Sequence, residues 1–595
     1  MLKISQAALV AATLMVAAPV SGALAQDIAP AVNEHWNEVF DAGFSYSLSI
    51  PTVLAVGSSM DEAALRDALG GKFLEHADEL SSLTATSITI PEISVTYSTS
   101  SAYGGAAKQT ISYKDIVFAN IKDGVAATAT LGSGETISPE MTQTIGTTTL
   151  KDFDIGATLA FFTGGGEAGS EMQTIYSSST GAGQKISSPL FNCEIGESSG
   201  GGFRMRPLKL SFARFIEISN KMAVVDGQPA KVSPEEIRDY VGFIADGFHA
   251  FEYDPSTFAG FSCSGSGPDG KPFTVSLGPV TGDGYLDGAL RAITLKDFKL
   301  IADDGNVSLG STVFKPLDFK PWIKALESNL DEVNPEWLSR NWRLLVPAWD
   351  GLAFSGLAVD VPDTNVPGGR VNVKVADFDL SLANYINGIP SQISSFAKEV
   401  EVPFPETSTD PQIGLLMAAG MSGVNLGYDL NAHWDEATKS IVIGNIGVSG
   451  KDLGSLAVAA NIGNAAEQIF ALDTNVALAS LMGVTVKNLK IDLTDTGMSN
   501  IAIPIFAGQQ GADPESFRKQ MAGTAEGMVI ALLGSTDSAR QLGAALSNFI
   551  NGTAGSVSIS VVSKDPMGLP IPLLMQASQN PQLLGDQVTI TGNGQ

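Results

Sequence analysis

The sequence predicts an α+β fold dominated by antiparallel β-structure, in which long repetitive meander sheets carry amphipathic helices on one face. Three observations lead to this class: a short strand-like segment that recurs along the chain, alternating runs separated by polar turns, and helices with well-formed N-caps. Alternation of apolar and polar residues is typical of strands with one buried face. Short turns between such strands indicate antiparallel pairing.

A recurring six-residue segment indicates where strands lie. The letters TLKDF occur at residues 149–153 and again at 294–298. Looser copies share the frame apolar, any, Asp/Asn/Gly, apolar, any, apolar; they begin at Tyr113, Phe354, Val375, Met421, Ile443 and Val486. Asp, Asn and Gly permit the backbone conformations found where a strand is entered or bulged. Because the spacing varies, the repetition predicts one strand unit with insertions rather than a regular solenoid.

Polar turns separate several alternating runs. Asp303-Asp304-Gly305-Asn306 and Ser449-Gly450-Lys451-Asp452 each lie between two such runs and predict β-hairpins. Residues 161–206 differ in composition from the rest of the chain, because they are rich in Gly and Ser and show only weak hydrophobic periodicity. We expect long loops or irregular strands there.

Helix-start signals lie between the strands. Ser233-Pro234-Glu235-Glu236 combines an N-cap serine, Pro at the first helical position and Glu at the third. Similar signals begin at Ser59 and Asp513, and a partner helix follows from Asp537 to Asn551. Further helices are expected at 320–345, 382–400 and 464–481. Each has one apolar stripe, which should pack against the sheet.

The first 25 residues have the features of a secretory signal peptide. Lys3 precedes an apolar run from Ala7 to Val20, and the small-x-small pattern Ala23-Leu24-Ala25 follows. We expect cleavage between Ala25 and Gln26 and an exported protein. An uncleaved anchor is the alternative, which the shortness of the run and Pro19 disfavour. No later apolar run is long enough to span a membrane, so we expect no transmembrane segment after cleavage.

Length and charge limit the organisation and the partners. We expect a signal peptide at 1–25, an N-terminal β-rich lobe with Gly/Ser-rich loops at 26–290, and a C-terminal lobe with repeated strands and helices at 291–595. The formal net charge is −28, and loss of Lys3 with the signal peptide makes it −29. Such a surface repels phosphate backbones, so we expect no nucleic-acid partner.

The two cysteines predict a disulfide. Cys193 and Cys263 are the only cysteines, and an isolated pair in an oxidising compartment is most simply bonded. Two unpaired buried thiols are the alternative. The pair and four scattered histidines do not supply a metal-ligand set, and no cofactor motif is present.

The search for catalytic motifs finds two matches by letter. Residues 196–200, GESSG, fit the G-x-S-x-G nucleophile elbow with Ser198 as nucleophile. The glycines and proline that follow prevent the helix that this motif requires, and neither His249 nor His433 is supported as its base. Ser395-Phe396-Ala397-Lys398 fits S-x-x-K but lacks the companion elements. We therefore assign no catalytic residue and expect no enzymatic activity.

The segment WDEATKSIVIGNIGVSGKDLGSLAVAANIGN at 434–464, with its alternating strands, resembles the AsmA-like and YdgA-like exported proteins of Gram-negative envelopes. In its pattern of repeated strands the chain most resembles uncharacterised periplasmic proteins of alphaproteobacteria. The similarity extends from about residue 290 to the end, with a fainter copy at 113–155. The resemblance implies a periplasmic location and a sheet that forms a groove for lipid. AsmA-like members are anchored in the inner membrane, whereas the N-terminus of this chain looks cleavable.

Three functions remain as hypotheses. The first is a non-enzymatic periplasmic protein that binds or shuttles a lipid or another hydrophobic ligand in a β-sheet groove. The second is an envelope structural or assembly factor that offers sheet edges or helices to partner proteins. The third and least favoured is a serine hydrolase that uses Ser198.

Overall fold

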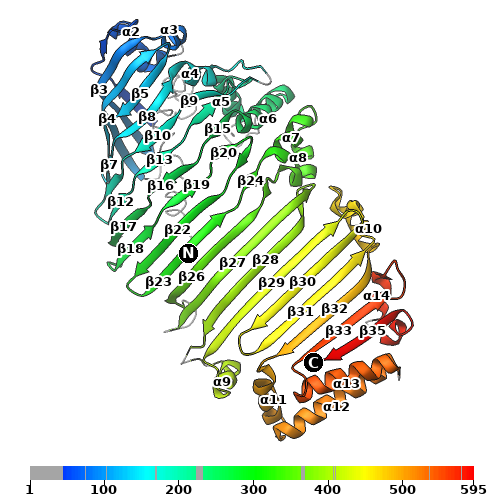
Figure 1. The fold of residues 1–595 in the computed structure, drawn as a ribbon. Coiled ribbons are helices and arrows are strands. Elements are labelled where there is room, and N and C mark those ends of the chain that lie inside the picture. Colours follow the sequence, from blue (N-terminus) through cyan, green and yellow to red (C-terminus); the bar gives the residue numbers. More distant parts are fainter. Residues whose placement is uncertain are drawn as a thin grey trace. The chain divides into compact units, whose positions relative to one another are not determined.

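The computed structural model describes residues 44–595, except 74, 102–103, 168–169, 223–231, 268, 364–368, 406–407, 409, 535 and 578. The predicted signal peptide of residues 1–25 and the cleavage site between Ala25 and Gln26 lie outside the described residues. The fold is α+β and mostly antiparallel, as the sequence predicts, with long meanders of strands that are neighbours in the sequence (Figure 1).

The chain forms two units. Unit 1 contains the described residues up to Asp303 together with Pro316–Ser339, and unit 2 contains Asp304–Lys315 together with Arg340–Gln595. The sequence placed the division between residues 290 and 291. Segment Asp304–Lys315 belongs to unit 2 although unit 1 contains the residues on both sides of it.

The N-terminal part of unit 1 is a sheet with a core formed by short helices. Its strands are β1 (Phe44–Ser49), β2 (Leu54–Val56), β3 (Ala85–Ser101), β4 (Gly104–Lys122), β5 (Val125–Leu131), β6 (Ser133–Ile137), β7 (Thr142–Ile145) and β8 (Thr148–Asp154). Leu65 of α2 (Glu62–Asp67) and Leu80 of α3 (Ala77–Ser81) are buried with Ile90 of β3. The N-cap of α2 is Asp61, which accepts from the N–H of Ala64, so the expectation of a cap at Ser59 is wrong.

The Gly/Ser-rich region forms short strands, as expected. These are β9 (Gln173–Tyr176), β10 (Ser178–Gly181), β11 (Gln184–Ser187), β12 (Phe191–Ile195), β13 (Ser198–Gly200) and β14 (Phe203–Met205). Breaks of one or two residues, such as Ser177 and Gly201-Gly202, divide longer strands in two. As a result β10 and β13 belong to the main sheet, whereas β9 and β14 belong to a second, smaller sheet.

The rest of unit 1 extends both sheets. Its strands are β15 (Phe251–Tyr253), β16 (Ser256–Phe258), β17 (Phe261–Ser266), β18 (Pro272–Leu277), β19 (Val280–Gly282), β20 (Tyr285–Leu286), β21 (Ala289–Leu290), β22 (Ile293–Ala302) and β24 (Leu317–Asp318). The helices are α4 (Ile155–Thr163), α5 (Phe212–Met222), α6 (Pro234–His249), α7 (Lys320–Ser328) and α8 (Pro335–Asn341). The predicted capping box is confirmed at the start of α6, where Ser233 and Glu236 each bond the backbone of the other.

Unit 2 is a meander of long strands with helices between some of them. The strands are β23 (Gly305–Phe314), β25 (Ala348–Trp349), β26 (Gly351–Pro362), β27 (Arg370–Ile386), β28 (Ile389–Pro403), β29 (Gly423–Asp435), β30 (Ser440–Gly450), β31 (Gly454–Gly463), β32 (Thr485–Asp495), β33 (Ser556–Ser563), β34 (Leu569–Pro570) and β35 (Val588–Gly594). The α-helices are α9 (Pro411–Ala418), α10 (Thr474–Met482), α11 (Met498–Gln509), α12 (Pro514–Leu533), α13 (Asp537–Asn551) and α14 (Ile571–Ala577). A 3₁₀ helix, η3 (Glu467–Phe470), precedes α10.

The helix expectations for this part of the chain are confirmed in four places and wrong in one. Helices occupy parts of 320–345 and 464–481, α12 follows the predicted cap Asp513, and α13 begins at the predicted residue Asp537, with Thr536 as its N-cap. Residues 382–400 instead form the end of β27 and most of β28. Ile389, Ile393 and Phe396 have helix-like spacing, but β28 is paired on both sides along its length. Tertiary pairing therefore overrides the local pattern.

The recurring segment marks β-bulges and strand starts, as its Asp, Asn and Gly residues suggested. Asp115, Asp152 and Asp297 all adopt a left-handed backbone, with φ of 52°, 54° and 52°, and Gly356 has φ 67°. In the copies at Ile443 and Val486 the strand register shifts by a residue. The copy at Met421 leads into β29. A bulge adds one residue to one strand, which shifts all later side chains of that strand by one position. Where the sequence alternation also shifts by one residue, the two shifts cancel and the apolar side chains stay on one face.

Candidate functional site

One face of the unit 2 sheet carries continuous rows of apolar side chains. Directly opposite partners across β26–β33 form a first row: Phe354, Phe378, Ala397, Tyr428, Val448, Leu456, Leu493 and Val557. A second row lies two residues along each strand: Leu352, Leu380, Ser395, Leu430, Ile446, Val458, Ile491 and Ile559. Side chains two residues apart point to the same side of a strand, so both rows lie on one face, here named the apolar face.

The apolar face is long. Neighbouring strands lie about 4.8 Å apart, so rows that cross eight strands extend over roughly 34 Å. A third row continues the face beyond the second: Leu382, Ile393, Ala432, Ile443, Ala460, Leu489 and Val561. Ser395 is the polar member of these three rows besides the hydroxyl of Tyr428, and the two hydroxyls lie 3.0 Å apart.

The middle of the apolar face is open to solvent. Val448 is 54 % exposed, Ile446 45 %, and Tyr428 and Leu456 38 % each. The opposite side of the same strands is polar, with Ser449, Ser455 and Thr494 directly opposite one another in a row. Large exposed apolar surfaces are typical of interaction sites. The apolar face is therefore the candidate site, whereas the opposite face of the same sheet is an ordinary polar surface.

Two margins of the apolar face are covered. On one side α13 lies over β35, where the first two rows end at Gly594 and Gly592. A Cβ at Gly592 would lie 2.5 Å from Leu542 Cδ1, so this glycine permits the close approach of the helix. At the end near η3, the Trp434 ring packs against Phe470, and its Nε1 donates to Ala465 O at 2.7 Å. Ile441 and Ile462 join the same cluster.

Ser198 does not have the surroundings of a catalytic nucleophile. It is the first residue of β13 and lies between Gly181 of β10 and Phe258 of β16 in the sheet. The chain continues into strand β14 rather than a helix, so no helix N-terminus supplies the oxyanion-hole amide. His433, one of the two bases considered, is in β29 of unit 2. The geometry gives the hydrolase hypothesis no support.

The S-x-x-K match also separates into unrelated positions. Ser395 and Lys398 lie three residues apart on strand β28, so their side chains leave opposite faces. Ser395 belongs to the apolar face, whereas the Lys398 ammonium lies 4.7 Å from the centre of the Phe396 ring. A base and a nucleophile on opposite faces cannot exchange a proton.

A Lys–Asp–Ser cluster in unit 2 was missed by sequence reasoning. Lys315 Nζ lies 2.7 Å from Asp379 Oδ2 and 2.5 Å from Ser381 Oγ, and Ser381 donates to Asp379 Oδ1 at 2.7 Å. Lys315 is 64 residues from Asp379 and 66 from Ser381 in the sequence, so only the strand pairing brings it to them. Lys315 donates to both Asp379 and Ser381, and Ser381 donates to Asp379, so the three side chains satisfy one another's hydrogen bonds. This cluster is an ion pair that fastens the strands.

The predicted disulfide is confirmed. Cys193 of β12 lies directly opposite Cys263 of β17, and the two sulfurs are bonded. The bond joins neighbouring strands of the Gly/Ser-rich region, whose short strands have few buried apolar residues. It therefore fastens a part of unit 1 that hydrophobic burial stabilises weakly.

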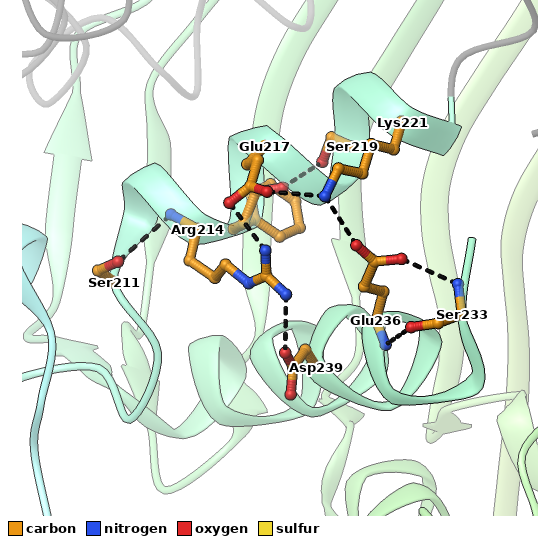
Figure 2. Close-up of polar contacts among 9 residues, drawn as sticks. Ser211, Arg214, Glu217, Ser219, Lys221, Ser233, Glu236 and Asp239 are labelled. Atoms are coloured by element: carbon orange, nitrogen blue, oxygen red, sulfur yellow. Dashed lines mark hydrogen bonds and ion pairs between the residues drawn. The ribbon is translucent and has the colours of Figure 1, made fainter. Parts of the chain in front are cut away.

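The densest charge network of unit 1 lies between α5 and α6 (Figure 2). Lys221 Nζ lies 2.7 Å from Glu217 Oε1 and 2.8 Å from Glu236 Oε1, and Arg214 Nη1 donates to Glu217 Oε2 at 2.8 Å. The Lys221 ammonium and the backbone N–H of Ser233 lower the pKa of Glu236 to about 2. Each cation is paired with a carboxylate, and the network joins the two helices rather than leaving a free charge.

Two general searches complete the description of candidate sites. In the described ranges, no three His, Cys, Asp or Glu side chains come together in a group that would hold a metal ion. None of the helices in the described part of the chain is long and apolar enough to span a bilayer.

Comparison with protein families matches the last part of the chain. A family model described as "Uncharacterized protein" matches residues 447–593, from within β30 to within β35. No curated protein matches the chain. The matched stretch lies in unit 2 and contains the last strands of the apolar face together with α10–α14.

Proposed function

We propose that the apolar face of unit 2 binds a hydrophobic ligand, with the acyl chains of a lipid as the ligand class, and that the protein is a non-enzymatic periplasmic carrier. The observation that carries the proposal is the pair of cross-strand rows from Phe354 to Val557 and from Leu352 to Ile559, which are apolar except for Ser395 and the Tyr428 hydroxyl. Burial of apolar surface contributes about 25 cal/mol per Å². A ligand that covers several of these side chains at once is therefore bound by the sum of their buried areas.

The shape of the face fits an extended ligand better than a compact one. The rows run across the strands for roughly 34 Å, and the covered margins at α13 and at Trp434 confine a ligand to the open middle. The hydroxyls of Ser395 and Tyr428 are already paired with each other. The face therefore offers contact area without many polar groups to satisfy, which suits a hydrocarbon chain.

The first test is native mass spectrometry of the purified protein, followed by solvent extraction and lipid analysis. We expect additional mass that resolves into phospholipid or fatty acid. The matched pair Val448→Asp and Ser449→Asp then locates the site, because the two residues are adjacent on β30 and point to opposite faces. Val448→Asp should lose the bound lipid and Ser449→Asp should retain it. A clean polypeptide mass for the wild type, or equal lipid loss in both variants, contradicts the proposal.

An assembly factor is the second candidate, because a flat apolar sheet face also accepts the sheet of another protein at a separation of about 10 Å. In that case a stoichiometric protein partner, rather than lipid, would co-purify with the wild type and be lost in Val448→Asp.

A further inference from the structure

A second apolar surface lies in unit 2 at the start of β32. Seven apolar side chains there are each between 42 % and 63 % exposed. They come from α10, from the segment before α14, from α14 itself and from the turn that follows it: Val476, Leu478, Leu481, Met482, Met567, Met575 and Leu583. We name these residues the α10–α14 patch.

The elements of the patch lie at one end of unit 2 because both are attached to the start of β32. Helix α10 leads directly into β32, and β34, which precedes α14, pairs with the first residues of β32 through Thr485 and Val486. The hydroxyl of Thr485 donates to the carbonyl of Met567. Figure 1 shows α10 and α14 at the same end of the unit 2 strands.

The patch lies on two segments without charged residues. Residues 474–486 and 566–585 contain no Asp, Glu, Lys, Arg or His, and the charged residues that flank them are Asp473, Lys487, Asp565 and Asp586. Three of the seven exposed side chains are methionines, which adapt to irregular apolar surroundings. A protein interface normally includes a polar rim and hydrogen bonds at regular intervals, whereas insertion into lipid depends mainly on the apolar area buried.

The patch and the apolar face adjoin the same buried cluster. Ala465, Ile469, Phe470 and Val484 form this cluster, which packs against Ile571 of α14. It also packs against Ile441 and Ile462, which lie two residues beyond Ile443 and Ala460 of the third row. The patch therefore lies beside the covered margin of the apolar face.

From these observations we infer that the α10–α14 patch inserts into the interface of a lipid bilayer, with preference for zwitterionic over anionic headgroups. The preference follows from the absence of cationic residues in both segments and from the formal net charge of −28. The role of the patch in delivering lipid to the apolar face rests on the proposed function, whereas its contact with a bilayer does not.

Vesicle flotation tests this inference. Purified protein is mixed with phosphatidylcholine vesicles and, separately, with vesicles that contain phosphatidylglycerol. We expect the wild type to float with the first and less with the second. The double variant Leu478→Asp/Leu481→Asp should lower the vesicle-bound fraction by about tenfold or more, because two exposed leucines of α10 no longer insert. Leu190→Asp, at a similarly exposed leucine in unit 1, is the matched control and should float as the wild type does.

Val448→Asp separates this inference from the proposed function, since it changes the apolar face and leaves the patch intact. It should still float with phosphatidylcholine vesicles. Wild-type protein that fails to float, stronger flotation with anionic vesicles, or equal loss in the α10 and Leu190 variants overturns the inference. A wild type that floats but carries no lipid after extraction leaves the patch in place and overturns the carrier function alone.

Discussion

Ser177 holds the bulge at Asp152 through its backbone and its side chain: its N–H donates to Lys151 O at 2.9 Å, and its hydroxyl donates to Asp152 Oδ2 at 2.5 Å. The second TLKDF copy repeats the arrangement, because the N–H of Gly278 donates to Lys296 O at 2.9 Å beside Asp297. In both copies the aspartate is left-handed and the partner residue is small. The repeated letters thus encode one bulge geometry used twice.

The bulge gives the first prediction. Asp297→Gly should leave stability nearly unchanged, because glycine adopts φ near 52° without strain. Asp297→Val should lower the free energy of unfolding by about 1–3 kcal/mol, since a β-branched residue is strained in that conformation. Thermal denaturation of both variants checks this. Lys299→Val, an exposed position of ordinary strand geometry on the same strand, is the control, and equal losses at both sites would argue against the bulge as the cause.

The buried ion pair of unit 1 gives the second prediction. Arg206 Nη2 donates to Asp246 Oδ1 at 2.6 Å, and the two residues are only 9 % and 2 % exposed. Asp246→Ala should cost about 3–5 kcal/mol in unfolding free energy, because it leaves the guanidinium buried without its partner. Asp239→Ala, at a partly exposed position of the same helix where Asp239 pairs with Arg214, should cost under about 1 kcal/mol. Urea denaturation measures both, and similar losses would refute the distinction.

The third prediction concerns acid. The pKa of Glu236 is lowered from 4.5 to about 2 by Lys221 and by the Ser233 N–H, so the folded protein binds this proton less readily than the unfolded chain. The stabilising contribution is therefore complete above pH 4.5 and is lost as the pH falls towards 2. A carboxyl NMR titration should place Glu236 near 2. Glu236→Gln should remove this part of the acid sensitivity, while Glu235→Gln, the neighbouring residue in α6, should retain it.

The fourth prediction concerns the disulfide. Replacing Cys193 and Cys263 by serine should lower the free energy of unfolding by about 4 kcal/mol, from the entropy of the 70-residue loop in the unfolded chain. Strand pairing between β12 and β17 should persist, because it continues on both sides of the bond from Phe191 to Ile195. Denaturation of wild-type protein with and without reductant should reproduce the difference. An unchanged midpoint after reduction would show that the bond contributes little.

The sequence predicts the fold class and the strand positions well because both depend on local patterns. Most copies of the recurring segment are found at bulges or strand starts, whereas the copy at Val375 lies within β27. The caps at Ser233 and Asp513 form as expected. Residues 382–400 show the limit of such patterns. Their apolar spacing fits a helix, and only the strands on both sides of β28 decide otherwise.

The candidate sites were less accessible to sequence reasoning, since they depend on strand register. Val448 and Leu456 are near in sequence, but their alignment with Phe354 and Val557 in one row requires the pairing of eight strands. A shift of one residue in any strand would move its members to the other face. Similarly, the uncharged segments at 474–486 and 566–585 form one patch only because both are attached to the start of β32.

Strand pairing between sequence neighbours has a consequence for how unit 2 is assembled. From β26 to β32 every strand pairs with the next one along the chain, so the paired residues are close in sequence and the contact order is low, even where α9 or α10 lies in the connection. The pairing of β32 with β33 is different, because α11–α13 separate them. We expect the strands to be added one by one during synthesis, each using the last as its template. While α11–α13 are being synthesised, β32 has no partner on its free edge. We expect pairing of this edge with other chains, and hence aggregation, to occur most readily during that interval.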